Sequence, residues 1–426
     1  MKRLGMLIIA AASLLFASCS SSSDDGEETS TDIDNTPKEE HFELTTAEKK
    51  MVDVGNDFAF RLLRAVSDDA GERSMAFSPM STSYLLGMLA EGAEGQTREE
   101  IVQLLGLQGL DAATVNGFFH KMLTTSPRVD LNVTLSQANA LYGNQHRDIR
   151  FLQQYVKTMQ ETYAAAVSTL DFTQQETLGS MNRWCSEHTK GLVPEMLTPQ
   201  EYDADAMAYL LNAVYFQAPW TSAFDEKETG KGVFTTTGGQ QREVYMMQKT
   251  AQVDYFSDGN CQVAVLPYGN GSYQMMLILP STEGSIRLSD MERQLSSAYW
   301  QQMLAESAKN RQEVRILLPR FHAESKTDLI SPLMSLGMKK AFANGDFSRM
   351  LTSQTGFQIQ KMLQKAVIEV SEQGTKSATG SMAEIGVTSP GQDLSAIPVF
   401  NADHPFLYVI YESSTHAIFF IGEYAG

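Results

Sequence analysis

The residues from Glu372 to Ser381 have types and spacing that would let them change conformation. They read EQGTKSATGS, and such small, polar, turn-prone residues are typical of an exposed loop. From Thr375 to Val387, however, every second residue is small or apolar and uncharged. This period of two is typical of a strand that buries one face. The segment therefore indicates two states, a loop and a later central strand, as in a loop-insertion mechanism. An ordinary surface loop with accidental alternation explains these residues equally well.

Motifs of nucleophilic, phosphate-binding and metal-dependent catalysis are missing from the sequence. No serine stands in a Gly-x-Ser-x-Gly turn, no glycine-rich loop ends in Lys-Ser or Lys-Thr, and there is no His-Glu-x-x-His. Cys185 and His188 are close in sequence, but no second pair of ligands completes a zinc site, so packing on a helix explains them better. Scattered histidines and carboxylates could still meet in space. We predict a protein that is not an enzyme and that needs no cofactor or metal.

The N-terminus has the features of an export signal. Lys2 and Arg3 precede an apolar run to Phe16, which is too short to span a bilayer as a mature helix. The sequence LFASC ending at Cys19 resembles a bacterial lipoprotein cleavage box, in which this cysteine becomes the lipidated first residue. We therefore expect a signal peptide over 1–18 and a lipid anchor at Cys19. Simple secretion with an incidental cysteine is the alternative.

A tether is expected over residues 19–45, because this segment is rich in serine and acidic residues and poor in apolar ones. It resembles the acidic export tails of surface lipoproteins in Bacteroidetes-type bacteria. Such an anchor would hold an exported protein at the outer membrane, on the cell surface, with the membrane touched only through the lipid.

Composition limits the partners of the remaining chain, which reads as one domain over 46–426. The formal net charge is −18 and no cluster of five or six basic residues occurs, which argues against nucleic acid, glycosaminoglycans and anionic lipid. The hydrophobic fraction of 42% is enough for a full core. Cys185 and Cys261 are too few for a disulfide framework, so we predict two buried free thiols.

Hydrophobic periodicity predicts helices first and strands later. The expected helices cover 52–66, 81–89, 97–105, 151–162 and 177–189. The expected strands cover 207–216, 262–268, 272–279, 313–318, 407–411 and 417–421. Asn270-Gly271 predicts a hairpin turn. This order, without regular βαβ units, indicates an α+β fold.

Sequence blocks spread over about residues 54–424 resemble those of the serpin family and occur in the family order. They include FSP from Phe77, LGMLAEGAEGQT from Leu86, NALY from Asn139, NRW from Asn182, LNAVYFQAPWTSAF from Leu211, LPYGNGSYQMMLILP from Leu266, LPRF from Leu318, KAVIEVSEQGT ending at Thr375, ADHPFLYVI from Ala402 and FFIGEY from Phe419. The resemblance implies three β-sheets, eight or nine helices and an exposed reactive loop near the C-terminus, at about 372–399.

The resemblance also implies a mechanism. In inhibitory serpins a protease cleaves the reactive loop and is trapped as an acyl-enzyme, while the loop inserts into the main sheet as a new central strand. The hinge residues carried over to this chain are Glu372, Gly374, Thr375, Lys376, Ser377, Ala378, Thr379 and Gly380. Glu372, Gly374 and Thr375 match the inhibitory hinge pattern, and the residues from Ser377 to Gly380 are small. Lys376 is charged, but the alternation places it on the outward face, so the segment favours insertion.

Five further residues match positions where the main sheet of serpins opens, namely Ser78, Ser81, Asn212, Gln364 and Trp220. Gln364 stands where the family usually has a histidine, which normally hydrogen-bonds the neighbourhood matched by Ser78, Ser81 and Asn212. Its amide can donate and accept but cannot titrate, so no pH-switched opening is expected from it. Trp220 matches the top of the main sheet. Ordinary core packing is the alternative for all five.

The spacing from the hinge places the reactive bond at Thr388–Ser389, whereas counting back from His404 places it about three residues later. We prefer the hinge count, because the inserted length governs trapping. Val387 and Thr388 suit elastase-like enzymes, and the absence of Lys and Arg between Ser377 and Leu407 argues against trypsin-like targets. We expect a monomeric suicide inhibitor of serine proteases, with cysteine proteases as a second class of target. The alternative is a non-inhibitory binding or carrier serpin that is cleaved as a substrate.

Overall fold

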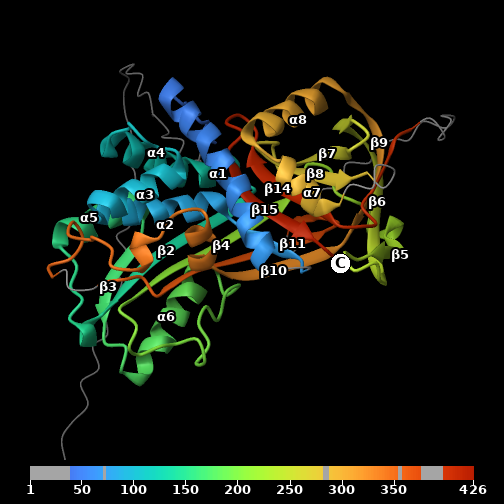
Figure 1. Ribbon diagram of the computed structural model, residues 1–426. Helices are drawn as coiled ribbons and strands as arrows, with labels where there is room; N and C mark the ends of the chain where they lie inside the picture. The colour runs from blue at the N-terminus through green and yellow to red at the C-terminus, as the bar shows by residue number, and fades with distance from the viewer. Residues whose placement is uncertain (1–38, 71–72, 282–286, 354–356, 376–396) are drawn as a thin grey trace, which may run out of the picture. The chain divides into compact units, whose positions relative to one another are not determined.

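The computed structural model describes residues 39–70, 73–281, 287–353, 357–375 and 397–426 (Figure 1). These residues belong to one compact unit that begins at Glu39. The described part contains nine α-helices: α1 (Thr46–Ala70), α2 (Pro79–Gly92), α3 (Gly95–Leu105), α4 (Ala112–Thr125), α5 (Gln153–Tyr163), α6 (Gln175–His188), α7 (Leu288–Gln294), α8 (Ser297–Lys309) and α9 (Ile330–Ser335). None of them is long and apolar enough to cross a lipid bilayer.

The described part also contains fifteen strands. They are β1 (Met75–Phe77), β2 (Thr134–Asn144), β3 (Ala166–Leu170), β4 (Ala208–Pro219), β5 (Gly230–Thr235), β6 (Gln241–Ser257), β7 (Cys261–Tyr268), β8 (Tyr273–Pro280), β9 (Arg311–Pro319), β10 (Phe321–Asp328), β11 (Lys361–Ser371), β12 (Gly374–Thr375), β13 (Val399–Asn401), β14 (Phe406–Glu412) and β15 (Ile418–Tyr424). Every helix and strand expected from periodicity is present, so the α+β class is confirmed.

The main sheet has the strand order β10-β11-β12-β4-β2-β3. Strand β4 is buried on both faces, which explains its continuous apolar sequence. Leu210 and Val214 join the large core, whereas Tyr209 and Leu211 join a smaller cluster with Met181 of α6. Helices α2 and α6 accordingly lie on opposite sides of this sheet (Figure 1). The sheet is thus a buried layer between two groups of helices.

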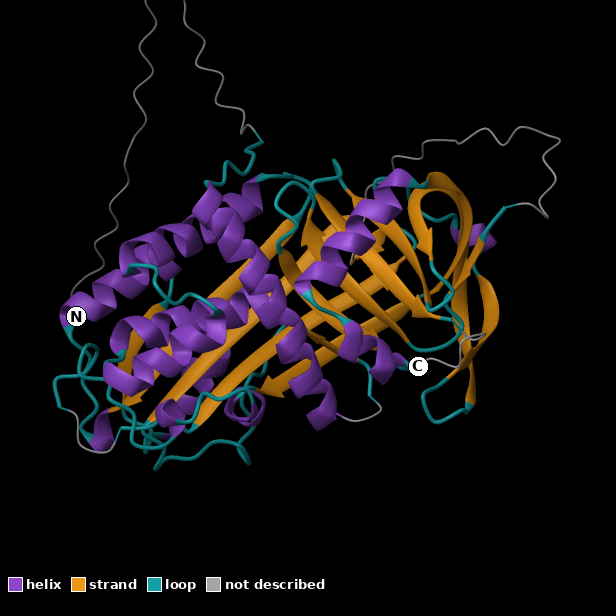
Figure 2. Cartoon of the chain, turned by 45° about the horizontal axis from the view of Figure 1, so that its top comes forward, coloured by secondary structure: helices purple, strands orange, loops and turns teal. Residues whose placement is uncertain are grey.

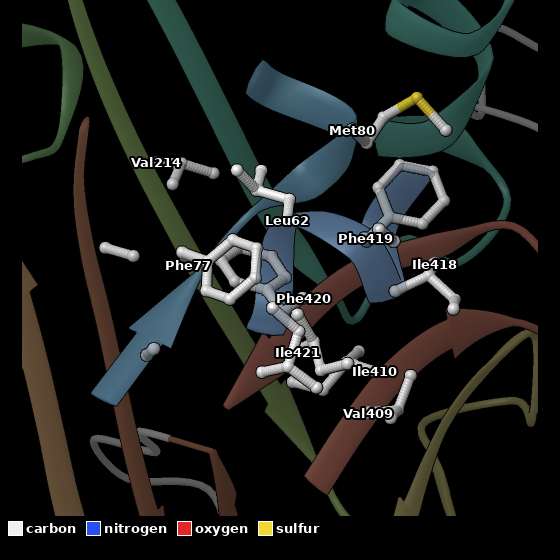
Figure 3. Close-up of a cluster of buried hydrophobic side chains, with 14 of the residues drawn as sticks. Leu62, Phe77, Met80, Val214, Val409, Ile410, Ile418, Phe419, Phe420 and Ile421 are labelled. Carbon is white, nitrogen blue, oxygen red and sulfur yellow. The ribbon is translucent and has the colours of Figure 1, made fainter. Parts of the chain in front are cut away.

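The second sheet has the order β1-β15-β14-β8-β7-β6-β9-β13, with β5 added on β6. Its strands run beneath α1 and α8 (Figure 2). Side chains from α1, α2, β1, β4, β14 and β15 meet in the large core between the two sheets, as Figure 3 shows for Leu62, Phe77, Met80, Val214 and Phe420. Because both sheets contribute to one core, each holds the other in place.

Three sheets are expected from the family resemblance, whereas hydrogen bonding joins the described strands into two. The reason is the length of β6. Its first residues pair with β5, its middle pairs with β9 from Met246 to Asp254, and its last residues pair with β7. One long strand is therefore shared by two groups of strands that would otherwise form separate sheets.

Residues 39–45, which are expected to belong to the tether, contact the body of the domain. Glu40 forms an ion pair with Arg128, and the Lys121 ammonium donates to the Glu43 carbonyl oxygen. The Thr45 amide donates to the Glu48 carboxylate at 2.7 Å, and the Glu48 amide donates to the Thr45 hydroxyl at 3.3 Å. This reciprocal capping box starts α1 at Thr46.

Candidate functional site

Gly374 and Thr375 form a two-residue strand, β12, that lies between β4 and β11 at one end of the main sheet. Thr375 is opposite Ala218 of β4 and Val370 of β11, and both pairings are antiparallel. Further along, β4 and β11 pair directly and in parallel, from Val367–Tyr215 to Lys361–Tyr209. The main sheet is therefore closed over most of its length and is split at this end by two residues.

The turn that leads into β12 requires a glycine at position 374. Gly374 has φ +140°, in the region that L side chains rarely adopt, and a Cβ atom there would lie 2.1 Å from the Ala218 carbonyl oxygen. Any other residue would push β12 away from β4. The match of Gly374 to the hinge pattern thus has a steric reason.

Glu372 fixes this turn through its buried side chain. Its carboxylate accepts hydrogen bonds from the Arg320 guanidinium and, at 2.8 Å, from the Thr229 hydroxyl. Burial by itself would raise the pKa of Glu372, but the bonds from Arg320 and Thr229 outweigh it and the pKa is lowered. The carboxylate is therefore charged at neutral pH and ties the turn after β11 to Arg320, between β9 and β10, and to Thr229, just before β5.

Trp220 holds the backbone of the same turn. Its indole nitrogen donates to the Ser371 carbonyl oxygen and its amide donates to the Gln373 carbonyl oxygen, each at 2.9 Å. The Phe224 amide donates to the Glu372 carbonyl oxygen at 2.8 Å. Each carbonyl from Ser371 to Gln373 therefore has a donor in the segment after β4.

Tyr268 contacts both Trp220 and the hinge. Its ring stacks on Trp220, with the ring centres 4.3 Å apart and the planes 10° apart. Its hydroxyl oxygen lies 2.6 Å from the Thr375 hydroxyl oxygen, and both residues are fully buried.

Lys249 packs against the segment that follows β4. Its ammonium lies 4.3 Å from the Phe224 ring centre and donates to the Ser222 carbonyl oxygen, and burial lowers its pKa to about 8.

Gln364 lies in the middle of the main sheet and links β11 to α2. Its side-chain oxygen accepts from the Ser78 amide at 2.7 Å, and its side-chain nitrogen donates to the Ser78 carbonyl oxygen and to the Thr82 hydroxyl. The amide therefore binds both groups of the Ser78 backbone, which an imidazole ring could do less readily.

Asn212 belongs to a separate polar group on the other side of the closed pairing. Its side-chain nitrogen donates to the Asn139 side-chain oxygen at 2.9 Å, which links β4 to β2. Asn212 is the direct register partner of Gln364, yet no described hydrogen bond joins the two side chains. Among the described residues, the buried Asn212 Oδ1 and Ser81 Oγ have no hydrogen-bond partner.

The structure thus brings Gln364 to Ser78, and leaves Asn212 and the Ser81 hydroxyl apart from that pair. Trp220 lies with the hinge. Arg320, Thr229, Tyr268 and Lys249 were not expected from the sequence as parts of the site. Arg320 and Tyr268 do fall within the blocks LPRF and LPYGNG, which carried the family resemblance.

The comparisons with known proteins agree on one family. A family model described as "Serpin (serine protease inhibitor)" matches residues 53–425. The chain belongs to the serpin family. Serpin B6 of Pongo abelii is 31% identical over 382 residues, which cover 88% of this chain and 99% of that protein. The leukocyte elastase inhibitor of Xenopus laevis is 30% identical over 379 residues, which cover 86% and 97% of the two chains.

A solved structure shows the range of functions on this serpin fold. Human thyroxine-binding globulin complexed with its hormone has a TM-score of 0.78 and 25% identity, with 89% of this chain and 99% of that chain covered. Serpins are protease inhibitors rather than catalytic enzymes, whereas this solved relative is named for binding thyroxine. Membership of the family is therefore compatible with protease inhibition and with binding of a small molecule, and the residues of the site must distinguish the two.

Several expected residues of this serpin lie outside the described part of the chain. They are the hinge residues Lys376, Ser377, Ala378, Thr379 and Gly380, the reactive bond Thr388–Ser389 and the lipid anchor Cys19.

The prediction of two free thiols is confirmed. Cys185 and Cys261 are buried and unpaired, and burial raises their pKa values to about 12 and about 11. Across the described ranges, no group of three or more His, Cys, Asp or Glu side chains could hold a metal ion.

Proposed function

We propose that this serpin is a suicide inhibitor of proteases that acts by inserting its cleaved reactive loop into the main sheet. The observation that carries the proposal is the position of β12. Gly374 and Thr375 are paired with both β4 and β11, so two residues at the start of the loop already occupy the place of a central strand.

The register of the sheet supports insertion of the residues that follow. Thr375 is opposite Ala218 and Val370, so position 381, six residues on, would fall opposite Asn212 and Gln364. Asn212 and Gln364 are already partners across the closed pairing. A strand continuing from β12 would therefore pair with both neighbours without a shift in either.

The alternation noted in the sequence gains a structural meaning from this register. Positions 377, 379 and 381 would share the buried face of Thr375, where Gln364 binds Ser78. Ser381 would bring a hydroxyl to the level of Asn212, whose buried Oδ1 lacks a partner in the described structure. Ladder bonds of about 0.5–1.5 kcal/mol each would give on the order of 10 kcal/mol for a whole strand.

We place the reactive bond at Thr388–Ser389 and expect serine proteases of the elastase type, with cysteine proteases as a second class. In the first step the protease serine oxygen bonds to the Thr388 carbonyl carbon, and the bond to the Ser389 nitrogen breaks. The leaving amine takes the proton that the serine hydroxyl gives up. Val387 and Thr388 support this target class, as does the likeness to a leukocyte elastase inhibitor.

The test is incubation of the chain from residue 20 onward with an elastase, followed by denaturing electrophoresis and mass analysis. We expect a band at the summed mass that survives SDS, and a released C-terminal fragment that begins at Ser389. Complete cleavage by a panel of serine and cysteine proteases without such a band would reject inhibition. The binding or carrier function, which the fold likeness to thyroxine-binding globulin favours, would then replace it.

We also propose that the protein is exported, lipid-anchored at Cys19 and displayed as a monomer on the surface of a Bacteroidetes-type bacterium. The sequence LFASC and the acidic segment after it support this. Labelling of the expressed chain with a radioactive fatty acid, which a Cys19→Ala variant should lose, tests the anchor. Retention of label by that variant would contradict it.

A further inference from the structure

We infer that Tyr268 is a positioning residue for inhibition: it holds Thr375 between β4 and β11 so that insertion starts from a pre-formed strand. The inference rests on the proposed function, because it concerns the step that follows cleavage. It assigns a role to a residue outside the hinge and outside the loop.

Tyr268 is well placed to hold Thr375 because it does not belong to the main sheet. It is the last residue of β7. Its ring is fixed by the stack on Trp220 and by an edge-to-face contact with Phe216, in which the ring centres are 5.2 Å apart. The Gly269 amide donates to the Pro219 carbonyl oxygen at 2.9 Å, which fastens the following turn to the end of β4. The hydroxyl that meets Thr375 is thus anchored from the second sheet.

The bond between Tyr268 and Thr375 affects the start of insertion more than its end. The first residues of a new ordered segment lose conformational freedom before many bonds have formed, so initiation is the unfavourable step. With Thr375 already in register, the next loop residue can pair as soon as the loop is cut. Without the bond, β12 must first be re-formed.

This delay has a measurable consequence, because insertion competes with hydrolysis of the acyl-enzyme. A slower start gives water more time to attack the ester carbonyl, which releases active protease and cleaved inhibitor. The rate of the initial cleavage does not depend on β12 in this scheme. Tyr268 therefore changes the partition between the two products and leaves the cleavage rate unchanged.

The test uses Tyr268→Phe, which keeps the ring and its stack on Trp220 and removes only the hydroxyl. One neutral hydrogen bond corresponds to about a two- to tenfold change in rate. We expect the ratio of cleaved to trapped inhibitor to rise by about that factor. The ratio is read from denaturing gels, and the initial cleavage rate from release of the C-terminal fragment.

A matched control is Tyr273→Phe in the same hairpin. Tyr273 is also fully buried, and its hydroxyl donates to the Ser126 carbonyl oxygen at 2.8 Å. We expect this variant to keep the wild-type ratio. Thr375→Val should raise the ratio as Tyr268→Phe does, and the double variant should add nothing further, because both changes remove the same bond.

Two outcomes would overturn the inference. If the wild-type chain traps protease and Tyr268→Phe leaves the ratio unchanged, or changes it no more than Tyr273→Phe, Tyr268 has no positioning role. If the wild-type chain traps no protease of either class, the proposed function fails and this inference fails with it.

Discussion

At the scale of single residues, Thr375 is closely surrounded, because it is fully buried between two strands and its hydroxyl contacts that of Tyr268. Gln373, two residues earlier, is exposed. Substitution of these two residues by arginine therefore distinguishes the effect of a charge inside the sheet from the effect of a charge next to the sheet.

Thr375→Arg should turn the inhibitor into a substrate, because the inserted strand would have to bury an unpaired guanidinium. We expect the share of trapped protease to fall at least tenfold, which denaturing gels would show. Gln373→Arg should behave as wild type. Normal trapping by Thr375→Arg would mean that the Thr375 face is not buried during inhibition.

Lys249, which packs on Phe224 next to the hinge, should make the free energy of unfolding depend on pH. Burial lowers its pKa from 10.5 to about 8, so between these values the unfolded chain binds more protons than the folded chain. The contribution of Lys249 to stability should therefore rise with pH from about 8 toward 10.5. Urea unfolding at pH 7.5 and 9.5 should show this rise in the wild type and a smaller one in Lys249→Met. Equal rises would contradict it.

At the scale of elements, some segments could be read from the sequence and others could not. Strand β4 was predicted because its residues are apolar on both faces. Strand β2 was missed because Gln137 and Asn139 interrupt the apolar side that faces α2, and Asn139 serves the polar group around Asn212. Helix α4 was missed because its glycine and threonines weaken the helical pattern.

Within the site, the hinge could be predicted because its residues are consecutive, and its partners could not. Tyr268 and Arg320 reach the hinge from positions 107 and 52 residues away in sequence. Nothing local to them indicates such contacts. The need for Gly374 likewise arises from the Ala218 carbonyl oxygen, which only the folded backbone brings near.

Helix α1 offers a change that should stabilise the fold. Gly55 lies in its interior, and a Cβ atom there would meet no atom within 4 Å. Gly55→Ala should raise the free energy of unfolding by about 0.5–1 kcal/mol, because alanine loses less backbone freedom in a helix. Thermal and urea unfolding would measure the gain.

Gly87 of α2 is the contrasting position for that test. A Cβ atom at Gly87 would lie 2.6 Å from the Tyr163 hydroxyl oxygen, so Gly87→Ala should lower stability. If Gly55→Ala and Gly87→Ala changed the free energy of unfolding in the same direction, the space around each glycine would not explain the effect of the substitution.

At the scale of the whole molecule, the polar groups divide along the line where β4 meets β11. Gln364 binds Ser78 of the chain entering α2, whereas Asn212 binds Asn139 of β2. No described side-chain bond joins Gln364 to Asn212. The two halves of the main sheet can therefore separate along this line without loss of either polar group, and an inserted strand would replace the backbone bonds that break.

A stability difference between the intact and cleaved chains should follow. After cleavage at Thr388–Ser389 the additional central strand should raise the midpoint of thermal unfolding by about 10 °C, given on the order of 10 kcal/mol of new ladder bonds. Circular dichroism on heating would measure it. The same cleavage of Thr375→Arg should give a smaller increase. An unchanged midpoint in the cleaved wild type would argue against insertion.

The two buried thiols allow local opening of the fold to be measured by chemical labelling. Cys185 lies in the cluster between α6 and the main sheet, with no exposed surface, and Cys261 lies in the large core. Alkylation of Cys185 by a small maleimide can proceed only while α6 lifts from the strands beneath it. Its labelling rate relative to Cys261 would therefore report how often α6 separates from the main sheet before any protease arrives.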